Sequence, residues 1–406
     1  MKKNLLVGQS GGPTAVINAS LAGVISAGFR KLGGKVYGCL NGIEGIEDEN
    51  IISLEKFRDD EELRLLRQTP SSILGSCRKK LPEPDEAPEV YSRIFDVFCK
   101  YEIGCFFYIG GNDSMDTVDK LNRYAESKGI DTKIIGVPKT IDNDLALTDH
   151  TPGYGSAAKF VANSMRQLAL DTGVYKMPSV IVLEIMGRNA GWLAAAAALA
   201  NDAKLRAADI ICLPEHPFDI DRFIERIGLL SREQKTVMIA VSEGIKDADG
   251  RYIEECTARK GVRGDKFAHA ALGGVGRTVE GRIAEELGLK TRTIELSTLQ
   301  RCWSAGTALC DVEEAFAAGC AAVDFAHGGM SGVVPGFVRK DGCDYEIEIV
   351  PMPVCKIANF EKKVPASMIS PDGFGVTSEF INYAAPLIQG EPELLYKNGV
   401  IRFAEI

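Results

Sequence analysis

The chain has 406 residues, of which 45% are hydrophobic and 25% charged, as is ordinary for a globular protein of two or three domains. Its net charge of −9 and its lack of a Lys/Arg-rich run argue against a nucleic-acid partner. The longest apolar runs are too short for a transmembrane helix or a signal peptide. Eleven cysteines without a CxxC pair, with only four histidines, argue against a zinc site or a disulfide framework. We therefore expect a cytoplasmic protein with reduced cysteines and no membrane or nucleic-acid partner.

Short apolar runs alternate with loops and helical patterns along most of the chain. Runs that are apolar throughout suit parallel strands buried on both faces, and their alternation with helices predicts βαβ units of the α/β class. Ligands of such sheets lie beyond the carboxyl ends of the strands. The expected strands are 5–7, 105–109, 134–137, 180–185, 210–213, 237–241 and 293–296. The expected helices are 15–30, 114–128 with Ser114 as cap, one from about 156, and an alanine-rich one ending at Ala200.

Three further segments are expected to be irregular or paired locally. Residues 82–88 (PEPDEAP) and the charged stretch 250–264 are predicted to be surface loops. The segment around Asp341–Gly342 predicts a β-hairpin that turns at these two residues.

The loop Gly8–Thr14 follows the first predicted strand and precedes a helix. Backbone N–H groups at a helix N-terminus bind anions, and glycines such as Gly11 and Gly12 let a phosphate approach closely. The loop is not a Walker A motif, because GxxxxGK[ST] is absent, and no dinucleotide fingerprint is found either. Taken alone, the loop is equally consistent with a tight turn.

Two later loops combine glycines with carboxylates. Gly110–Ser114 ends a strand and carries Asp113 at a helix start, where an Asp/Ser cap is the alternative reading. In Pro138–Asp144, the carboxylates Asp142 and Asp144 are two residues apart, so one can accept a proton while the other helps to hold Mg²⁺. Lys139 can neutralise phosphoryl oxygens. The alternative for this loop is a solvated acidic turn.

Polar loops also end two strands in the second half of the chain. Met186-Gly187-Arg188 follows one strand and Ser242-Glu243-Gly244 another. Arg292 and Arg301 bracket a strand and a polar loop. A guanidinium group matches the geometry of phosphate oxygens, so these arginines can bind a phosphate on a substrate. A surface ion pair is the alternative for each arginine taken singly.

As an ordered set, these motifs resemble the phosphofructokinase family over roughly residues 4–340. The motifs that carry the resemblance are SGGPTAVINA (10–19), LGSCR (74–78), IGGNDS (109–114), PKTIDND (138–144), EIMGR (184–188), SEG (242–244) and LQR (299–301).

The resemblance implies Mg²⁺-dependent phosphorylation of fructose 6-phosphate at its 1-hydroxyl, with Asp142 as the base. It implies Thr140, Lys139 and Arg188 as further catalytic residues, and Gly11, Gly12, Arg78, Gly111, Asp113 and Lys139 as phosphoryl-donor ligands. It implies a sugar site of Thr140, Asp142, Met186, Gly187, Arg188, Glu243, Arg292 and Arg301, and a metal site of Asp113, Asp144 and Asn112.

Two residues indicate which phosphoryl donor is used. Asp113 and Lys139 replace glycines that are typical of bacterial ATP-dependent members, and both substitutions resemble the pyrophosphate-dependent branch. A carboxylate at 113 repels the α-phosphate of a nucleotide, and a lysine at 139 adds a cation for pyrophosphate. Because pyrophosphate is a poorer donor than ATP, we expect a readily reversible reaction.

Three positions depart from the family pattern. Asn112 stands where most members have an aspartate that serves Mg²⁺, and Thr298 replaces a histidine at the sugar phosphate. Lys204 replaces an effector-site glutamate, which puts the usual allosteric regulation in doubt.

The resemblance also implies the domain layout: two Rossmann-like α/β domains with mostly parallel sheets and the active site in the cleft between them. We expect a phosphoryl-donor domain at 1–150 plus about 300–345, a fructose 6-phosphate domain at 151–299, and a C-terminal extension at 346–406 that packs on both. A homodimer or homotetramer is implied, in which Arg292 reaches a neighbouring subunit's sugar site.

Other functions stay open at this point. The first alternative is an ATP-dependent 6-phosphofructokinase, and a wider one is a kinase acting on a nucleotide or lipid. An alternative of another class is a catalytically silent subunit that binds sugar phosphate and regulates a partner, which Asn112 keeps open.

Overall fold

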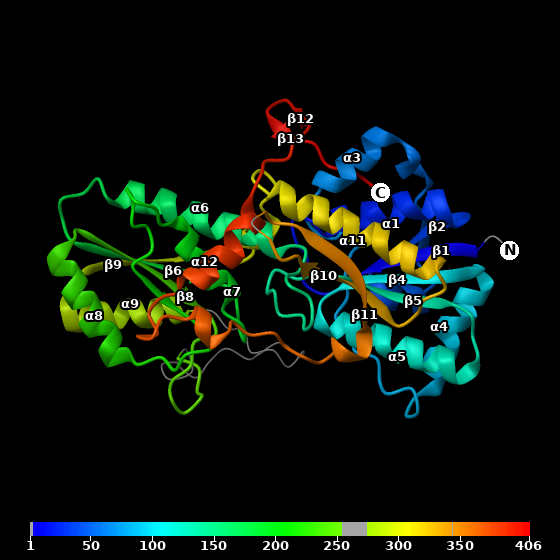
Figure 1. Cartoon of the computed structure of the whole chain (residues 1–406), viewed down its shortest axis with the longest axis horizontal. Coiled ribbons are helices and arrows are strands. Elements are labelled where there is room, and N and C mark those ends of the chain that lie inside the picture. Colours follow the sequence, from blue (N-terminus) through cyan, green and yellow to red (C-terminus); the bar gives the residue numbers. More distant parts are fainter. Residues whose placement is uncertain (1–2, 254–273, 343) are drawn as a thin grey trace. The chain divides into compact units, whose positions relative to one another are not determined.

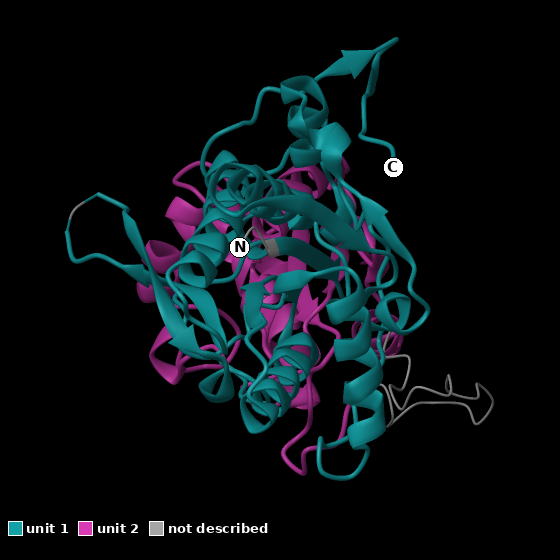
Figure 2. Cartoon of the chain, turned by 90° about the vertical axis from the view of Figure 1, so that its right-hand side faces the viewer, with its two compact units in different colours: residues 1–156, 301–362, 389–406 teal, residues 157–300, 363–388 magenta. Residues whose placement is uncertain are grey.

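The computed structural model describes residues 3–253, 274–342 and 344–406 (Figure 1). The chain divides into two compact units (Figure 2). Unit 1 comprises residues 1–156, 301–362 and 389–406, and unit 2 comprises 157–300 and 363–388. The C-terminal segment from 346 is thus shared between the two units. Most of the loop expected at 250–264 lies outside the described residues.

Unit 1 is built on a seven-stranded sheet with the order β11-β10-β5-β4-β1-β2-β3. The five central strands run parallel, and β3 and β11 pair antiparallel at the two edges. The strands are β1 (Lys3–Gln9), β2 (Gly33–Cys39), β3 (Ile51–Ser53), β4 (Ile103–Gly110), β5 (Lys133–Pro138), β10 (Val333–Arg339) and β11 (Ile347–Pro353), with a separate small pair β12 (Tyr396–Lys397) and β13 (Val400–Ile401). The helices are α1 (Ile17–Lys31), α2 (Gly42–Glu47), α3 (Asp60–Gln68), α4 (Pro88–Lys100), α5 (Asn112–Lys128) and α11 (Leu309–His327).

Helices cover both faces of this sheet, which explains why the central strand β4 is apolar and buried throughout. Phe106 and Tyr108 of β4 pack into one core cluster with α4 and α5, while Phe107 and Ile109 pack into the opposite cluster with α1 and α11. Figure 1 shows the same layering, with α1 and α11 on one side of the sheet and α4 and α5 on the other. Successive residues of a strand point to opposite faces, so a doubly covered strand needs apolar side chains at every position.

Unit 2 contains a four-stranded parallel sheet with the order β7-β8-β6-β9. Its strands are β6 (Ser179–Ile185), β7 (Ile210–Cys212), β8 (Thr236–Ser242) and β9 (Lys290–Glu295). Its helices are α7 (Trp192–Ala195), α8 (Ile220–Glu233), α9 (Val275–Leu287) and α12 (Ser378–Ala384), and α6 (Tyr154–Thr172) and α10 (Leu299–Cys302) lead the chain from one unit into the other. No helix in the described ranges has the length and apolar character needed to cross a membrane.

Three local predictions were wrong in detail. Helix α5 begins at Asn112 with Gly111 at the N-cap, so Ser114 is not the cap; its side chain is buried against Gly110. The alanine-rich helix is a short α7 followed by a 3₁₀ segment at Ala196–Ala200. The predicted hairpin exists as β10–β11, but residues 340–346 join its strands, so the connection is longer than a two-residue turn.

Candidate active site

Four loops of unit 1 meet at the carboxyl ends of β1, β4 and β5. Neighbouring parallel strands end at the same edge of a sheet, which brings the loops that follow them together. The Ser10 amide donates to the Ile109 carbonyl over 2.9 Å, and the Lys139 amide donates to the Gly110 carbonyl over 3.0 Å. The Gly11 amide reaches the carbonyl of Cys77 over 3.2 Å. Residues 10–12, 76–78, 110–114 and 139–144 are called the unit 1 loop cluster below.

Glycines leave space for cations in this cluster. Gly11 has φ of +76°, and a Cβ added to it would lie 3.3 Å from Lys139 Nζ. A Cβ added to Gly12 would lie 3.3 Å from Arg301 Nη1. The structure therefore brings together the predicted donor loop and two predicted phosphate-binding side chains, although sequence analysis assigned Arg301 to the sugar phosphate.

Lys139 is a buried residue, and burial makes its charged form unfavourable. Lys139 is only 3% exposed to solvent. Burial lowers the pKa of Lys139 to about 8, while the charges of Asp142 and Asp144 act in the opposite direction. The charges of Arg301 and Arg78 lower the pKa of Lys139 further. Such a group gains most from a polyanionic ligand.

The paired carboxylates of the TIDND loop are held in a partly buried position. Burial raises the pKa of Asp142, against the hydrogen bond from Thr140 and the charge of Lys139, which lower it. The Thr140 hydroxyl lies 3.2 Å from Asp142 Oδ2 and 3.1 Å from the Asp142 amide. Burial, with the nearby charges of Asp142 and Glu361, raises the pKa of Asp144 to about 7. A carboxylate with a raised pKa is suited to accept a proton.

This chemistry fits a magnesium ion bound together with a phosphate ligand. Burial raises the pKa of both carboxylates, and a divalent cation beside them would favour their charged forms. Within the described part of the chain, no group of three or more His, Cys, Asp or Glu side chains is arranged to hold a metal. Mg²⁺ typically binds through one or two carboxylates plus substrate phosphates, so a preassembled cage is not needed.

Two residues of the predicted metal site have protein partners in the structure. Asp113 forms an ion pair with Lys80 over 2.8 Å, and both side chains are about two-thirds exposed. Asn112 accepts a hydrogen bond from the Asn359 amide over 2.5 Å and donates one to the Phe360 carbonyl over 2.7 Å. A metal role for Asp113 and Asn112 stays a prediction.

A second set of loops meets in unit 2, at the carboxyl ends of β6 and β8. The Gly187 amide donates to Glu243 Oε1 over 3.3 Å, and the Ser242 hydroxyl donates to the Gly187 carbonyl over 2.5 Å. The Met186 amide donates to Oε1 of the buried Gln300 over 3.3 Å. Residues 186–188, 242–244 and 300 are called the unit 2 loop cluster. It joins three of the sequence motifs: MGR, SEG and LQR.

Close packing shapes this cluster. Gly187 has φ of +142°, which strongly favours glycine, and a Cβ added to Gly244 would lie 1.9 Å from the Arg188 carbonyl oxygen. Arg292 is not part of the cluster within one chain. It is paired in register with Ile181 in the middle of β6, and its side chain is exposed.

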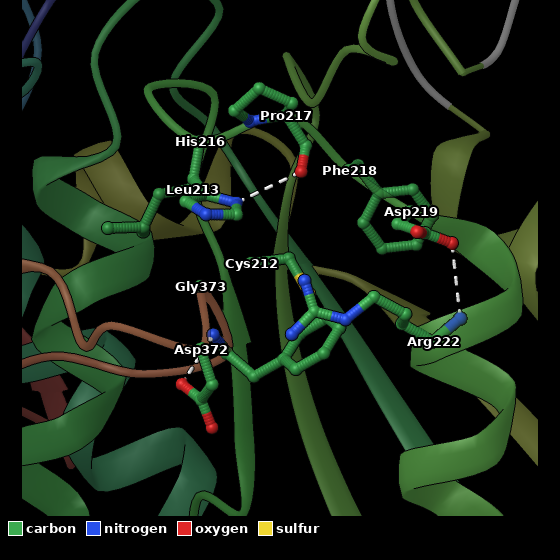
Figure 3. A pocket seen from close by; sticks show the side chains of 10 residues that line it. Cys212, Leu213, His216, Pro217, Phe218, Asp219, Arg222, Asp372 and Gly373 are labelled. Carbon is green, nitrogen blue, oxygen red and sulfur yellow. Dashed lines mark hydrogen bonds between the residues drawn. The ribbon is translucent and has the colours of Figure 1, made fainter.

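A separate small pocket of unit 2 contains none of the predicted site residues (Figure 3). It lies beyond β7 and is lined by ten residues that include Cys212, His216, Arg222 and Asp372. Its free volume of about 10 Å³ is close to the space of one water molecule. The His216 ring nitrogen already contacts the Pro217 carbonyl over 2.9 Å. The pocket is too small for a metabolite.

Several residues that support the two clusters were not predicted from the sequence. Glu361 acts on the pKa of both carboxylates of the TIDND loop, and Lys362 contacts the same loop. Glu184 of β6 accepts hydrogen bonds from the amides of Gly274 and Gly276 at the start of α9. Glu361 and Lys362 belong to no motif with a chemical pattern of its own, so the sequence did not point to them. Glu184 begins the EIMGR motif, but no role was assigned to it.

Comparison with known proteins places these observations in a family. The chain is 43% identical over 407 residues to the pyrophosphate–fructose 6-phosphate 1-phosphotransferase of Xanthomonas campestris pv. campestris (strain B100), with 99% of this chain and 96% of the relative covered. It is 41% identical over 402 residues to the enzyme of the same name from Methylococcus capsulatus, with 98% and 94% covered. The crystal structure of a pyrophosphate-dependent phosphofructokinase from Nitrosospira multiformis matches with a TM-score of 0.89 and 38% identity, over 98% of this chain and 95% of that chain. The family model described as Phosphofructokinase matches residues 4–326, and the chain therefore belongs to the phosphofructokinase family.

Proposed function

We propose that this protein transfers a phosphoryl group from pyrophosphate to the 1-hydroxyl of fructose 6-phosphate and that the reaction is reversible. The observation that carries the proposal is the buried Lys139 beside Asp142 and Asp144, at glycine loops of a phosphofructokinase-family chain. The relatives named for this reaction align with nearly the whole chain.

Asp142 acts as the general base in this proposal. Its raised pKa and its contact with the Thr140 hydroxyl support the role. The 1-hydroxyl oxygen attacks the nearer phosphorus of pyrophosphate while its proton passes to the Asp142 carboxylate. The bridging P–O bond breaks, and orthophosphate leaves. Lys139, Arg78 and Arg301 stabilise the negative charge on the phosphoryl oxygens.

The donor preference rests on Lys139 and Asp113. Lys139 offers its charge to a compact polyanion, with Gly11, Gly12 and Gly111 leaving the room for it. Asp113 opposes the α-phosphate of a nucleotide. Mg²⁺, held by Asp144 and by pyrophosphate oxygens, would supply positive charge that offsets the charge of the donor.

Met186, Gly187, Arg188 and Glu243 bind the sugar phosphate in this proposal, and the hydrogen bonds of the unit 2 loop cluster hold their loops. Arg292 lies level with the middle of β6 and not at its carboxyl end. We therefore assign Arg292 to the sugar site of a second copy of the chain, which makes the protein a homodimer or homotetramer.

The reaction can be tested by ³¹P NMR on purified protein with fructose 6-phosphate, pyrophosphate and Mg²⁺. Equal amounts of orthophosphate and fructose 1,6-bisphosphate are expected, and the reverse reaction is expected from these products. Binding of fructose 6-phosphate by isothermal titration without any product would contradict the proposal and favour a silent regulatory subunit.

A further inference from the structure

Residues 359–362 of unit 1 connect the start of α5 to the TIDND loop. At one end, the Asn112 side chain bonds the backbone of this segment twice, accepting from the Asn359 amide over 2.5 Å and donating to the Phe360 carbonyl over 2.7 Å. The Asn359 side chain donates to Asp116 of α5 over 2.8 Å. The segment is therefore fixed to the N-terminal part of α5, at Asn112 and Asp116, by three hydrogen bonds.

At its other end, the same segment pairs with the loop that follows Asp142. The Lys362 amide donates to the Asp144 carbonyl over 2.7 Å, and Leu145 forms an antiparallel bridge with Glu361. The Lys362 ammonium donates to the carbonyls of Thr148 and Asp149 over 3.1 and 2.6 Å, and to Asn143 Oδ1 over 3.3 Å. One ammonium thus contacts three points of the loop 143–149.

These contacts continue to the proposed base through a short chain of hydrogen bonds. Asn143 is fully buried with φ of +55°, in the left-handed region that asparagine tolerates better than most non-glycine residues. Its Oδ1 also accepts from the Thr151 amide over 3.1 Å. The Thr151 hydroxyl donates to the Thr140 carbonyl over 2.7 Å, and the Thr140 hydroxyl contacts Asp142. Lys362 is therefore linked to the backbone that carries the reacting carboxylate.

We propose that Lys362 is a positioning residue for Asp142 and Asp144, and that Asn112 serves this purpose by anchoring the segment that carries Lys362. The inference rests on the proposed function, because the activity it affects is that phosphoryl transfer. Neither residue touches the reacting atoms in this account. Burial lowers the pKa of Lys362 to about 8, which means that burying its charged form costs free energy. The hydrogen bonds of its ammonium to the loop 143–149 offset this cost.

The amide of Asn112 is suited to this role in a way that a carboxylate is not. It both donates to and accepts from the backbone of the segment, whereas an ionised aspartate can only accept. An aspartate here would place a charged oxygen against the Phe360 carbonyl. The identity of residue 112 is thereby explained by the segment 359–362 and not by a metal ion.

The first test compares Lys362→Met with Lys356→Met, a control at an exposed lysine of the same unit. We expect Lys362→Met to lower kcat per folded molecule by about 10- to 100-fold, since small displacements of reacting groups cost this much. KM for fructose 6-phosphate should change less than about threefold, because the sugar-binding loops are untouched. Lys356→Met should match the wild type. An unchanged kcat in Lys362→Met, or an equal loss in the control, overturns the proposal.

The second test uses hydrogen exchange and needs no turnover. Amides in the peptide 140–151 should exchange about tenfold faster in Lys362→Met than in Lys356→Met, because the loop loses three hydrogen bonds. Equal exchange in both variants contradicts the positioning role. This arm decides the role of Lys362 even if the wild type fails to use pyrophosphate, in which case only the proposed function fails.

The third test is Asn112→Asp, which separates an anchor from a metal ligand and stands alone if Lys362→Met does not fold. As an anchor, Asn112→Asp should lower kcat and speed exchange in 140–151, without lowering the Mg²⁺ concentration needed for half-maximal activity. If Asn112 were a ligand, the added charge would lower that concentration and preserve or raise kcat. The second result overturns the proposal.

Discussion

The unit 1 and unit 2 loop clusters both lie at the carboxyl ends of parallel strands, yet they differ in how they are held together and in the pKa shifts of their side chains. In unit 1, burial lowers the pKa of Lys139 and raises those of Asp142 and Asp144. In unit 2, backbone amides and a serine hydroxyl hold the MGR and SEG loops. Buried charged side chains with shifted pKa values are typical of a site where a reaction takes place. Loops held by hydrogen bonds suit a site that binds a substrate. The difference supports our proposal that chemistry resides mainly in unit 1 and sugar recognition in unit 2.

The largest effect is expected from Asp142→Ser, which removes the proposed base. Loss of general base catalysis should lower kcat by about 10²- to 10⁴-fold with little change in KM. Steady-state kinetics in both directions measure this, with the exposed Asp85→Asn as a control of matched charge change. Near-normal turnover in Asp142→Ser would place the chemistry elsewhere.

A smaller loss is expected from Lys139→Met, which keeps the length of the side chain and removes the buried charge. Since one preorganised electrostatic group contributes about 10²- to 10³-fold, kcat with pyrophosphate should fall by this order. The matched control is Lys35→Met, at an exposed lysine of unit 1. Equal effects of the two substitutions would show that burial of the charge is irrelevant.

Glu243→Ala tests the role of the unit 2 loop cluster. It removes the carboxylate that accepts from the Gly187 amide and should raise KM for fructose 6-phosphate about tenfold, with a smaller change in kcat. Glu233→Ala, at the exposed end of α8, serves as control. If Glu243→Ala instead lowers kcat as much as Lys139→Met does, the division between chemistry and recognition is wrong.

The smallest effect on activity is expected at His150, a buried charged group of unit 1 outside the loop cluster. Its ring nitrogens contact Asp149 over 2.8 Å and Glu314 over 2.6 Å, while Arg339 and Tyr345 face the same two carboxylates. These acidic partners raise the pKa of His150 against the opposing effect of its burial. A raised folded-state pKa stabilises the protein fully below about pH 6.5, and this contribution is lost as pH rises through the folded-state pKa.

Thermal unfolding of His150→Gln at several pH values checks this. The Tm difference from the wild type should be largest below about pH 6.5 and shrink at higher pH, with kcat nearly unchanged. Asp149, whose pKa is lowered, contributes stability that is lost only in acid and so does not obscure the trend. A Tm difference that grows with pH would refute the assignment.

Much of the fold was predictable, because strands that are buried on both faces of a sheet appear in the sequence as runs of apolar residues. The strand around 105–109 was found because apolar residues fill every position, and the strand at 180–185 because all its residues except Glu184 are apolar. The change of the alanine-rich helix into a 3₁₀ segment at Ala196–Ala200 was missed, since alanine favours a helix without specifying where it tightens. The Ser114 cap failed because Gly111 already allows the extended conformation that an N-cap needs.

Candidate site residues could be predicted where they belong to a sequence motif. They could not be predicted where only the packing of distant segments brings them to the site. Spacing and residue type singled out Lys139 and the pair Asp142 and Asp144, and the family resemblance then implied the role of base for Asp142 and of donor ligand for Gly11. Lys362 could not, because its position beside the TIDND loop follows from a chain return of more than 200 residues. Asn112 was visible as a departure from the family pattern, but its partners at 359 and 360 are set by tertiary structure alone.

The most direct test of the account is a comparison of kcat/KM for pyrophosphate and ATP in the wild-type protein, at saturating fructose 6-phosphate and Mg²⁺. The buried charge of Lys139 and the carboxylate of Asp113 predict efficient turnover with pyrophosphate and at least about a hundredfold lower kcat/KM with ATP, equivalent to ~2.7 kcal/mol in transition-state stabilisation. Efficient turnover with ATP and none with pyrophosphate would contradict the account.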